Sequence, residues 1–197
     1  FRDDFEGALA DGWTWFFEYP DFWNLTEAPG SLRIILQNTS MTSEEPKNFL
    51  LRDAPQGNFE ITTLVQFTPS SNFQFAGLLI YDEPGSGNAM QFGRAFANCG
   101  ALDFCKGNAI YFDIAENNQG GKSNYATTVT SESTAYLRLS RVGNTYSGYY
   151  SEDGTNWTLI GQHESSLNPK FVGLIASQAY EASTTADFDY FTIELLP

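Results

Sequence analysis

The chain has little positive charge: its 197 residues include 10 Lys and Arg against 24 Asp and Glu, which gives a net charge of −14. A nucleic acid binds to a basic face because its phosphates have to be neutralised. The charge balance therefore disfavours nucleic acid as a partner, and it disfavours an anionic membrane surface for the same reason. It suits a neutral or cationic ligand, and acidic loops rich in Asn and Gly also suit calcium.

Cysteine and histidine are scarce as well, with two Cys and one His in the chain. Together they do not supply the four ligands of a structural zinc site. The spacing of Cys99 and Cys105 predicts a disulfide within a loop of an exported protein. Two free thiols in a cytosolic protein are the alternative.

No stretch of the sequence approaches the roughly 20 apolar residues of a membrane-spanning helix. No signal peptide is visible, and the chain begins abruptly at Phe1, which is typical of a mature protein or an excised domain. We therefore expect a secreted, extracellular protein without a membrane partner.

No segment shows a helical period over 11 residues. Short runs punctuated by Gly, Pro, Asn, Asp and Ser instead favour an all-β sandwich or barrel, and the length suits one domain over residues 1–197. The predicted strands are Asp4–Glu6, Thr14–Glu18, Ser31–Leu36, Phe49–Arg52, Phe59–Phe67, Phe73–Tyr81, Ala89–Phe96, Ala109–Ala115, Tyr136–Val142, Thr145–Ser151, Thr158–His163, Lys170–Ala176 and Ala186–Leu195.

Three of these strands follow one another closely and predict an antiparallel meander. Gly143-Asn144 separates the first from the second, and Asp153-Gly154 precedes the third. Both dipeptides supply the positive φ that tight hairpins need.

Alternation also assigns side chains to faces of the predicted sheets. In Phe73–Tyr81, Ala76, Leu78 and Ile80 lie opposite Phe75, Gly77, Leu79 and Tyr81, so both faces are apolar. We expect one face to pack in the core and the other to line a covered or ligand-facing concavity, where Gly77 allows close approach.

The motifs of the chain resemble a known family. In chain order they are DDFEG with a nearby Trp (Asp3–Gly7, Trp13), PGSLRI (Pro29–Ile34), NFLLRDAPQGNFEITTLVQF (Asn48–Phe67), FAGLLIYDE (Phe75–Glu83), AYLRLSRVGNTYSGYYSEDGTNWTLIG (Ala135–Gly161), VGLIAS (Val172–Ser177) and ADFDYFTIE (Ala186–Glu194). In this order they resemble the concanavalin A-like β-sandwich at the C-terminus of family-43 glycoside hydrolases of the β-xylosidase type, and related lectin-like modules share the pattern.

The resemblance implies a two-sheet antiparallel jelly-roll sandwich with a concave face, and glycan binding without catalysis. Fold alone does not fix function. The Cys99–Cys105 region and the loop from Trp13 to Trp23 fit the family pattern least, and we expect them to carry specificity of this domain's own.

Catalysis finds little support in the sequence. Glycoside hydrolysis needs two carboxylates roughly 5–9.5 Å apart across a cleft, and the E-x-D-x-x-E strand motif of sandwich glucanases is missing. Asp113 and Glu116 are three residues apart and are expected to point to opposite faces. The one histidine, His163, reads as an exposed strand residue, so we expect no enzyme activity from this chain.

A metal site is implied by the resemblance, because domains of this family commonly carry a structural calcium near the chain ends. The matching positions are Asp4 and Asp189, and hard oxygen ligands suit this ion. The alternative is a pair of solvated acids at strand ends.

A sugar site needs aromatic platforms for the ring faces and planar polar groups for the hydroxyls. The predicted concave face offers Gln74, Tyr81, Gln91, Arg94, Tyr111 and Asp113. Strict alternation places Gln91 and Arg94 on opposite faces, and the sequence leaves open which of them meets the ligand.

The second candidate for sugar binding is the loop from Trp13 to Trp23, where seven of eleven residues are aromatic. Trp15 and Trp23 are the predicted platforms. A hydrophobic plug that closes the sandwich is the alternative, although so many aromatic residues are not all expected to fit into one core.

We therefore predict a non-catalytic carbohydrate-binding module from a larger secreted glycoside hydrolase that acts on plant polysaccharide such as xylan. Its expected partners are a polysaccharide or oligosaccharide and a catalytic glycoside hydrolase domain. The alternatives are a structural accessory domain that packs on a catalytic domain, and a small jelly-roll hydrolase or lyase.

Overall fold

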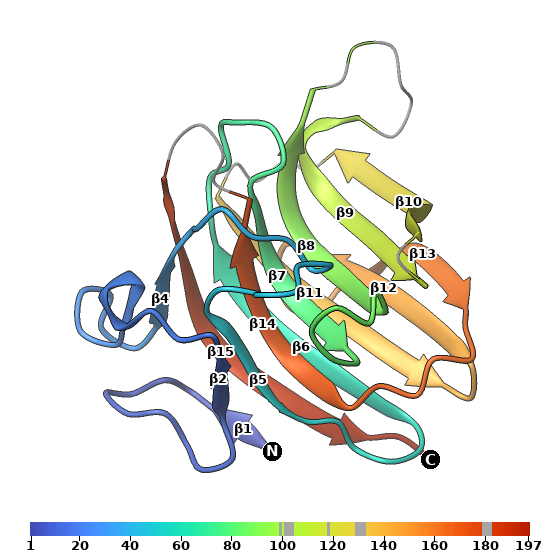
Figure 1. The fold of residues 1–197 in the computed structure, drawn as a ribbon, viewed down its shortest axis with the longest axis horizontal. Coiled ribbons are helices and arrows are strands. Elements are labelled where there is room, and N and C mark those ends of the chain that lie inside the picture. The colour runs from blue at the N-terminus through green and yellow to red at the C-terminus, as the bar shows by residue number, and fades with distance from the viewer. Residues whose placement is uncertain (99, 101–104, 118, 129–132, 179–182) are drawn as a thin grey trace.

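The computed structural model describes residues 1–98, 100, 105–117, 119–128, 133–178 and 183–197 (Figure 1). Within these residues the one helix is a single 3₁₀ turn, η1 (Pro20–Phe22), and all other regular structure is β-strand. None of the described segments forms a helix long and apolar enough to span a bilayer. The all-β prediction is confirmed.

The described strands form two antiparallel sheets. Sheet A has the order β13-β12-β11-β6-β15-β4-β3, and β1 pairs with β15. Its strands are β1 (Arg2–Asp3), β3 (Trp23–Asn24), β4 (Leu32–Ile35), β6 (Phe59–Gln66), β11 (Thr134–Val142), β12 (Thr145–Ser151), β13 (Thr158–Glu164) and β15 (Thr185–Leu195).

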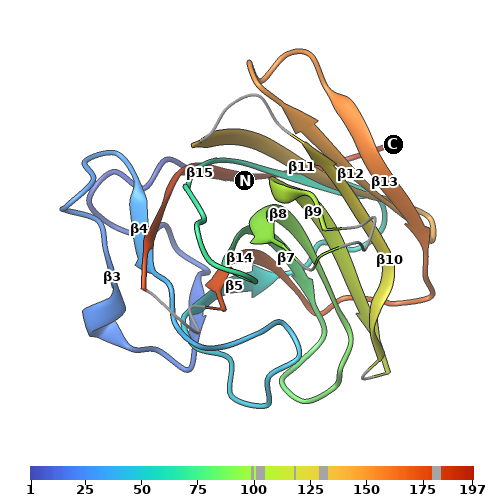
Figure 2. The same ribbon diagram turned by 90° about the horizontal axis from the view of Figure 1, so that it is seen from above.

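Sheet B has the order β10-β9-β8-β7-β14-β5-β2. Its strands are β2 (Thr14–Phe16), β5 (Phe49–Asp53), β7 (Phe75–Tyr81), β8 (Ala89–Ala97), β9 (Gly107–Glu116), β10 (Gln119–Thr128) and β14 (Phe171–Ser177). Figure 2 shows the two sheets as curved layers packed face to face. The two-sheet sandwich that the sequence predicts is therefore confirmed.

Period-two alternation explains the core between the sheets. Leu78 and Phe92 project from sheet B, and Ile61, Leu137 and Phe191 project from sheet A, all of them fully buried. A shift of one residue in strand pairing would turn these side chains to the opposite face of their sheet, so their burial fixes the register of each strand.

Sheet B is also apolar on its outer, concave face. A second cluster gathers there from β5, β7, β8, β9 and β14, and it includes Phe49, Leu79 and Ile175. Gly77 and Gly93 face each other on this side, and a Cβ at Gly77 would lie 2.3 Å from the carbonyl oxygen of Phe92. Only glycine fits where the strand backbones approach so closely.

Two connecting segments cover part of this concave face. In the segment from β4 to β5, Met41 and Pro46 are buried, and Met41 belongs to the apolar cluster on the concave face of sheet B. The β7–β8 loop lies on the same side of the sheet (Figures 1 and 2), and a Cβ at Gly85 would lie 3.6 Å from Cγ of Glu44. The two segments therefore meet above the sheet.

The predicted meander is present as β11, β12 and β13, which pair in sequence. Gly143 and Gly154 have φ of 61° and 73°, as the turn prediction requires. The chain adds a bulge between Gly148 and Tyr149 that the sequence pattern did not reveal.

Several strand ends differ from the prediction for a common reason, which is a positive φ at a non-glycine residue. The predicted first strand, Asp4–Glu6, is wrong: pairing occurs at Arg2–Asp3 and stops before Phe5, which has φ of 54°. Phe17 similarly ends β2, and Phe73 lies outside β7. The strand β10 was not predicted at all.

Candidate functional site

Four of the six residues predicted for the concave sugar site lie on the outer face of sheet B. Gln91 and Asp113 are direct partners across β8 and β9, and Tyr111 pairs with Gly93 two residues further along. Tyr81 pairs with Ala89, so it lies diagonally from Gln91 on the same face. Strand alternation and register place all four side chains together.

Gln91 and Asp113 form the polar centre of this face. Nε2 of Gln91 donates to Oδ2 of Asp113 at 3.0 Å. Asp113 lies deep in the protein but keeps part of its surface accessible, and burial raises the pKa of its carboxyl above the usual range, with the Gln91 hydrogen bond acting in the opposite direction.

Three polar atoms on this face have no hydrogen-bond partner among the described residues. They are the hydroxyl of Tyr81, Oε1 of Gln91 and the hydroxyl of Ser177, and the three residues are only 1%, 2% and 0% exposed. Burial also raises the pKa of the Tyr81 hydroxyl. The ring of Tyr81 meets Phe16 and Phe49 edge-on, on the side of sheet B that carries β5 and β2.

Tyr111 and Gln74 serve the local scaffold. The hydroxyl of Tyr111 donates to the carbonyl of Gly107 and accepts from the amide of Lys106, which holds the start of β9. Oε1 of Gln74 accepts from the amides of Ser70 and Ser71, and the Gln74 side chain is fully buried. Both residues therefore organise backbone turns.

Arg94 points to the other side of sheet B, as alternation from Gln91 requires. Its side chain is fully buried between the sheets, where Nε donates to Oδ1 of Asn108 at 3.0 Å and Nη1 donates to the carbonyl of Thr134 at 3.1 Å. Arg94 thus joins β8 to β9 and to sheet A. A ligand on the concave face does not reach it.

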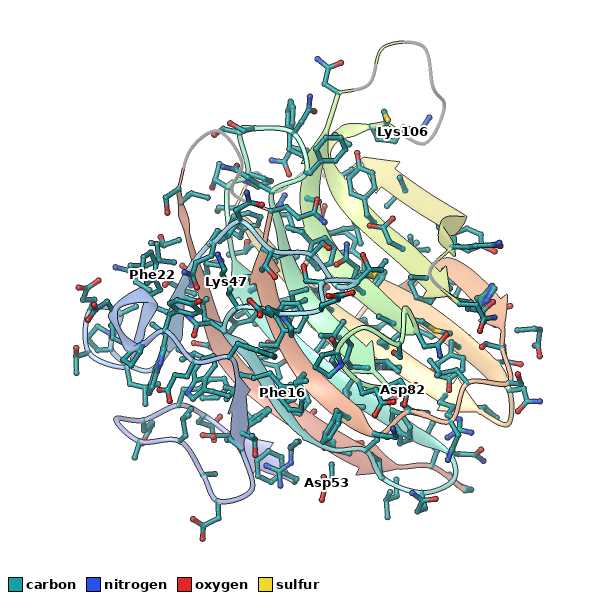
Figure 3. All side chains as sticks on the ribbon, viewed as in Figure 1. Phe16, Phe22, Lys47, Asp53, Asp82 and Lys106 are labelled. Atoms are coloured by element: carbon teal, nitrogen blue, oxygen red, sulfur yellow. The ribbon has the colours of Figure 1, made fainter. Side chains whose placement is uncertain are left out.

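The aromatic loop, defined as residues 13–23, divides its aromatic side chains between the core and the surface. Trp13, Trp15 and Trp23 are half-buried and pack against the core, and the ring centres of Trp15 and Trp23 lie 4.7 Å apart with their planes tilted by 33°. Phe16 lies over sheet B, whereas Phe22 lies at the outer edge of the molecule (Figure 3). The predicted platforms Trp15 and Trp23 are therefore the less exposed part of the loop.

The exposed part of the aromatic loop consists of Phe17, Tyr19 and Phe22, which we call the aromatic patch. These side chains are 45%, 42% and 36% exposed. Phe17 has φ of 50°, which is uncommon for a bulky residue and is found where the surroundings enforce it.

Asn48 holds the aromatic patch in place, a role that no sequence pattern indicates. Its Oδ1 accepts from the amide of Tyr19 at 2.6 Å, and its Nδ2 donates to the carbonyl of Tyr19 and to Oε1 of Gln37, each at 3.1 Å. The Asn48 amide also donates to the carbonyl of Phe17. Asn48 is buried and has φ of 52°, a conformation that Asn tolerates well.

A polar pocket of about 340 Å³ lies where several connecting loops meet at one end of the sandwich. It is lined by Asp82, Asn88, Glu116, Asn117, Ser165, Ser166, Leu167 and Asn168. Its two carboxylates are engaged: Lys170 lies 3.3 Å from Asp82, and Oε1 of Glu116 lies 3.2 Å from Nε2 of His163 and accepts from Ser165. These contacts do not present a free acid and base pair across a cleft.

A smaller pocket of about 240 Å³ lies at the β12–β13 turn, beside Asp153. The Asp153 carboxylate accepts hydrogen bonds from the amides of Thr155 and Asn156 and from the Asn156 side chain, and these bonds lower its pKa. Such a set of bonds is typical of a structural Asx turn.

The acids at the chain ends do not fit a calcium ion on their own. Asp4 is half-exposed and pairs with Arg2, whose guanidinium also lies over the Tyr190 ring near Asp189. Within the described part of the chain, no three acidic, His or Cys side chains gather where they could hold a metal. The calcium at Asp4 and Asp189 stays a prediction.

Asp3, next to Asp4, has a clear structural role that the sequence did not indicate. Its carboxylate accepts from the amides of Phe5 and Ala10 and from Nε1 of Trp13, all within 2.9 Å. It therefore ties the first strand to the start of the aromatic loop.

Cys99 lies outside the described residues, and Cys105 is half-buried just before β9. The predicted disulfide between them remains a prediction.

Two antiparallel sheets of this curvature and order define a concanavalin A-like β-sandwich. A sequence model of the family described as the beta xylosidase C-terminal concanavalin A-like domain matches residues 2–194. The chain therefore belongs to this family, which confirms the resemblance seen in its motifs.

The chain is similar to several known proteins. It is 35% identical over 82 residues, 40% of this chain, to the non-reducing end alpha-L-arabinofuranosidase BoGH43B of Bacteroides ovatus. It resembles the crystal structure of the GH43 BlXynB protein from Bacillus licheniformis (TM-score 0.86, 20% identity, 99% of this chain). The Bacteroides ovatus xyloglucan PUL GH43B structure is also similar (TM-score 0.83, 22% identity, 99% of this chain).

These proteins are much longer than the present chain. The match covers 15% of the arabinofuranosidase sequence and 39% of the chain in each of the two structures. The chain thus corresponds to the C-terminal domain of family-43 glycoside hydrolases.

Proposed function

We propose that this chain is the non-catalytic accessory domain of a longer glycoside hydrolase that acts on plant polysaccharide such as xylan, and that its aromatic patch docks onto the catalytic domain. The family and the names of the similar proteins support the hydrolase context. The 39% coverage of two similar structures leaves room for a second domain in the same polypeptide.

The observation that carries the docking proposal is the exposure of Phe17, Tyr19 and Phe22 on a loop that is held rigidly. Aromatic residues are enriched at the centres of protein interfaces, and an exposed cluster of them marks an interaction site. Because Asn48 fixes the loop before any partner binds, little conformational entropy is lost on docking.

Charge around the aromatic patch indicates the partner's chemistry. Glu18 and Asp21 are exposed within the loop, while the ammonium of Lys47 lies 5.7 Å from the Tyr19 ring centre. We expect a partner surface with an apolar pocket and a basic rim, because complementary charges steer association and exclude other partners.

The gene provides a first test, since a catalytic domain of family 43 should be encoded in the same reading frame. The two domains are then expressed separately and their affinity is measured by calorimetry. Phe17→Ser and Phe22→Ser should each weaken binding about tenfold or more, as expected of interface residues that contribute more than about 1.4 kcal/mol.

Leu159→Ser is the matched control for these variants. Leu159 is 47% exposed, and it lies on β13, at the opposite edge of sheet A from β3 beside the aromatic loop. This variant should bind like the parent chain. Equal affinities of all three variants and the parent would refute docking through the aromatic patch.

Carbohydrate binding is the second candidate function, and the partly accessible carboxyl of Asp113 on the apolar concave face of sheet B favours it. Sugars supply hydroxyl groups that can donate to such a carboxyl. Calorimetric titration with soluble xylan, arabinan, β-glucan and simple sugars tests this function. Failure of the folded chain to bind any of them would remove it.

We also propose that the protein works outside the cell, where the predicted Cys99–Cys105 disulfide would form. Mass spectrometry of the purified chain without reductant should find no alkylatable thiol. Two alkylatable thiols in protein taken from the culture medium would contradict the disulfide.

A further inference from the structure

The polar pocket of about 340 Å³ at one end of the sandwich, whose lining residues are given above, is called the loop pocket from here on. Tyr81 at the end of β7 pairs with Ala89 at the start of β8 and with Phe171 at the start of β14, so the β7–β8 and β13–β14 loops leave sheet B side by side. Ala89 also pairs with Ala115, which brings the β9–β10 turn to the same end. Asp82 marks this end in Figure 3. Strand register therefore assembles the walls of the loop pocket.

Hydrogen bonds between these segments hold the walls in place. Oδ1 of Asn88 accepts from the amide of Asn117 at 2.9 Å, which ties the β7–β8 loop to the β9–β10 turn. The hydroxyl of Ser165 donates to Glu116 at the end of β9 and accepts from the amide of Leu167, which ties the β13–β14 loop to the same strand. The loop pocket is therefore formed before any ligand binds, and little conformational entropy is lost in ordering its walls.

Accessible side chains on two of the walls are available to a ligand. Asn117 and Ser166 are exposed, and their side chains form no hydrogen bond within the described part of the chain. Oδ1 of Asn168 accepts from Nη1 of Arg141 at 3.2 Å, whereas Nδ2 of Asn168 is bonded to none of the described residues. Amide and hydroxyl groups of this kind donate and accept hydrogen bonds, so the three side chains offer both functions to a ligand.

The charges in the loop pocket favour a neutral ligand. Its two carboxylates repel an anion, and each of them is already engaged. Lys170 lies 3.3 Å from Asp82. Nε2 of His163 lies 3.2 Å from Oε1 of Glu116. No group of three or more acidic, His or Cys side chains among the described residues is placed to hold a metal ion. The rest of the polar lining consists of neutral amides and hydroxyls, which match the hydroxyl groups of a sugar.

Size also limits what the loop pocket holds. Its volume of about 340 Å³ is at the lower end of the range of small-molecule sites, which is about 300–1,000 Å³. This space suits about one or two sugar rings and not a longer chain. None of the described lining residues is aromatic, so hydrogen bonds and not ring stacking have to supply the affinity.

We propose that the loop pocket binds the end of a neutral polysaccharide chain through the side chains of Asn117, Ser166 and Asn168. This inference rests on the carbohydrate-binding function proposed above, and it assigns that function to the loop pocket and not to Asp113. It does not depend on docking through the aromatic patch.

Asn117→Gly is the most informative variant. Asn117 has φ of 53°, which glycine adopts freely, and the backbone amide that donates to Asn88 is retained. The variant should change the melting temperature by less than about 2 °C, as is usual for an exposed residue. It should weaken sugar binding about three- to tenfold, the effect of one net hydrogen bond.

A second variant and a matched control accompany Asn117→Gly. Ser166→Leu places an apolar side chain in the pocket wall and should weaken sugar binding at least as much, because it removes a hydroxyl and fills part of the space. Asn38→Gly is the control, since it makes the same chemical change at an exposed residue of the β4–β5 segment, outside the loop pocket. It should leave sugar affinity unchanged.

The titrations use D-xylose, L-arabinose, xylobiose and linear xylan fractions of different chain length, and Asp113→Asn reports on the concave face. At equal concentration of chain ends, binding should not depend on length beyond xylobiose. Sugar binding that increases with length, or that Asp113→Asn weakens while Asn117→Gly and Ser166→Leu leave it unchanged, would overturn the loop pocket as the site and retain carbohydrate binding. Absence of binding to every sugar would overturn both, while docking through the aromatic patch would stand.

Discussion

Replacing Asn48 with glycine should release the aromatic patch without altering the residues exposed on it. Asn48 has φ of 52°, which glycine adopts freely, so the change removes the side-chain hydrogen bonds and adds no backbone strain. Three hydrogen bonds are lost: two to the backbone of Tyr19 and one to Gln37.

The expected cost follows from these bonds. Each net hydrogen bond contributes about 1 kcal/mol, so Asn48→Gly should lower the free energy of unfolding by about 2–3 kcal/mol. For a chain of this size, that corresponds to a fall in melting temperature of about 4–12 °C. Asn48→Ala should cost about 1 kcal/mol more in the folded state, because a Cβ is strained at positive φ.

Urea unfolding measures the free energy, and hydrogen exchange of the Tyr19 amide measures the local effect. Asn38→Gly is the control, because Asn38 is exposed and should change stability by less than about 0.5 kcal/mol. If Asn48→Gly cost no more than this control, or if the Tyr19 amide exchanged at its original rate, Asn48 would not hold the patch.

Three further predictions concern charged groups. Burial raises the pKa of Asp113, so ionisation of its carboxyl lowers stability as the pH rises from about 4, the unfolded value, through the folded pKa. The Asp113→Asn variant should therefore unfold at a higher temperature than the parent chain at pH 7. A difference in melting temperature that is the same at pH 3 and at pH 7 would refute this. Arg94→Met removes the buried hydrogen bonds that this charged group donates to Asn108 and Thr134, and it should lower the free energy of unfolding by about 3 kcal/mol in urea titrations. A loss below about 1 kcal/mol would show that Arg94 does not join the sheets. If calcium binds at the predicted Asp4 and Asp189, adding a chelator should lower the melting temperature by more than about 2 °C in calorimetry, which corresponds to about 1 kcal/mol. An unchanged melting temperature would rule this calcium out and leave Asp4 with its Arg2 ion pair alone.

Local signals predicted most of the sandwich. The strands β11, β12 and β13 alternate clearly and are joined by Gly143-Asn144 and Asp153-Gly154, so their pairing was readable from sequence. The strand β10 has the sequence QGGKSNYATT, which is polar and rich in glycine and has no apolar alternation. It forms because β9 offers a free edge, and no window of its own sequence contains that information.

The candidate site was predictable only where it depends on local sequence patterns and not on tertiary contacts. Alternation correctly separated the faces of Gln91 and Arg94, because side-chain direction is a local property of a strand. The cover over the concave face depends on where the β4–β5 segment folds back, which is a tertiary property. Asn48 was missed because its partners Tyr19 and Gln37 lie 29 and 11 residues away.

Hydrogen exchange compared between this chain alone and the longer hydrolase that we propose tests the docking function most directly. Docking through the aromatic patch predicts slower exchange of the amides at Phe17, Glu18, Tyr19, Asp21 and Phe22 when the catalytic domain is attached. Unchanged exchange at these amides, with new protection only on another face of the sandwich, would contradict it.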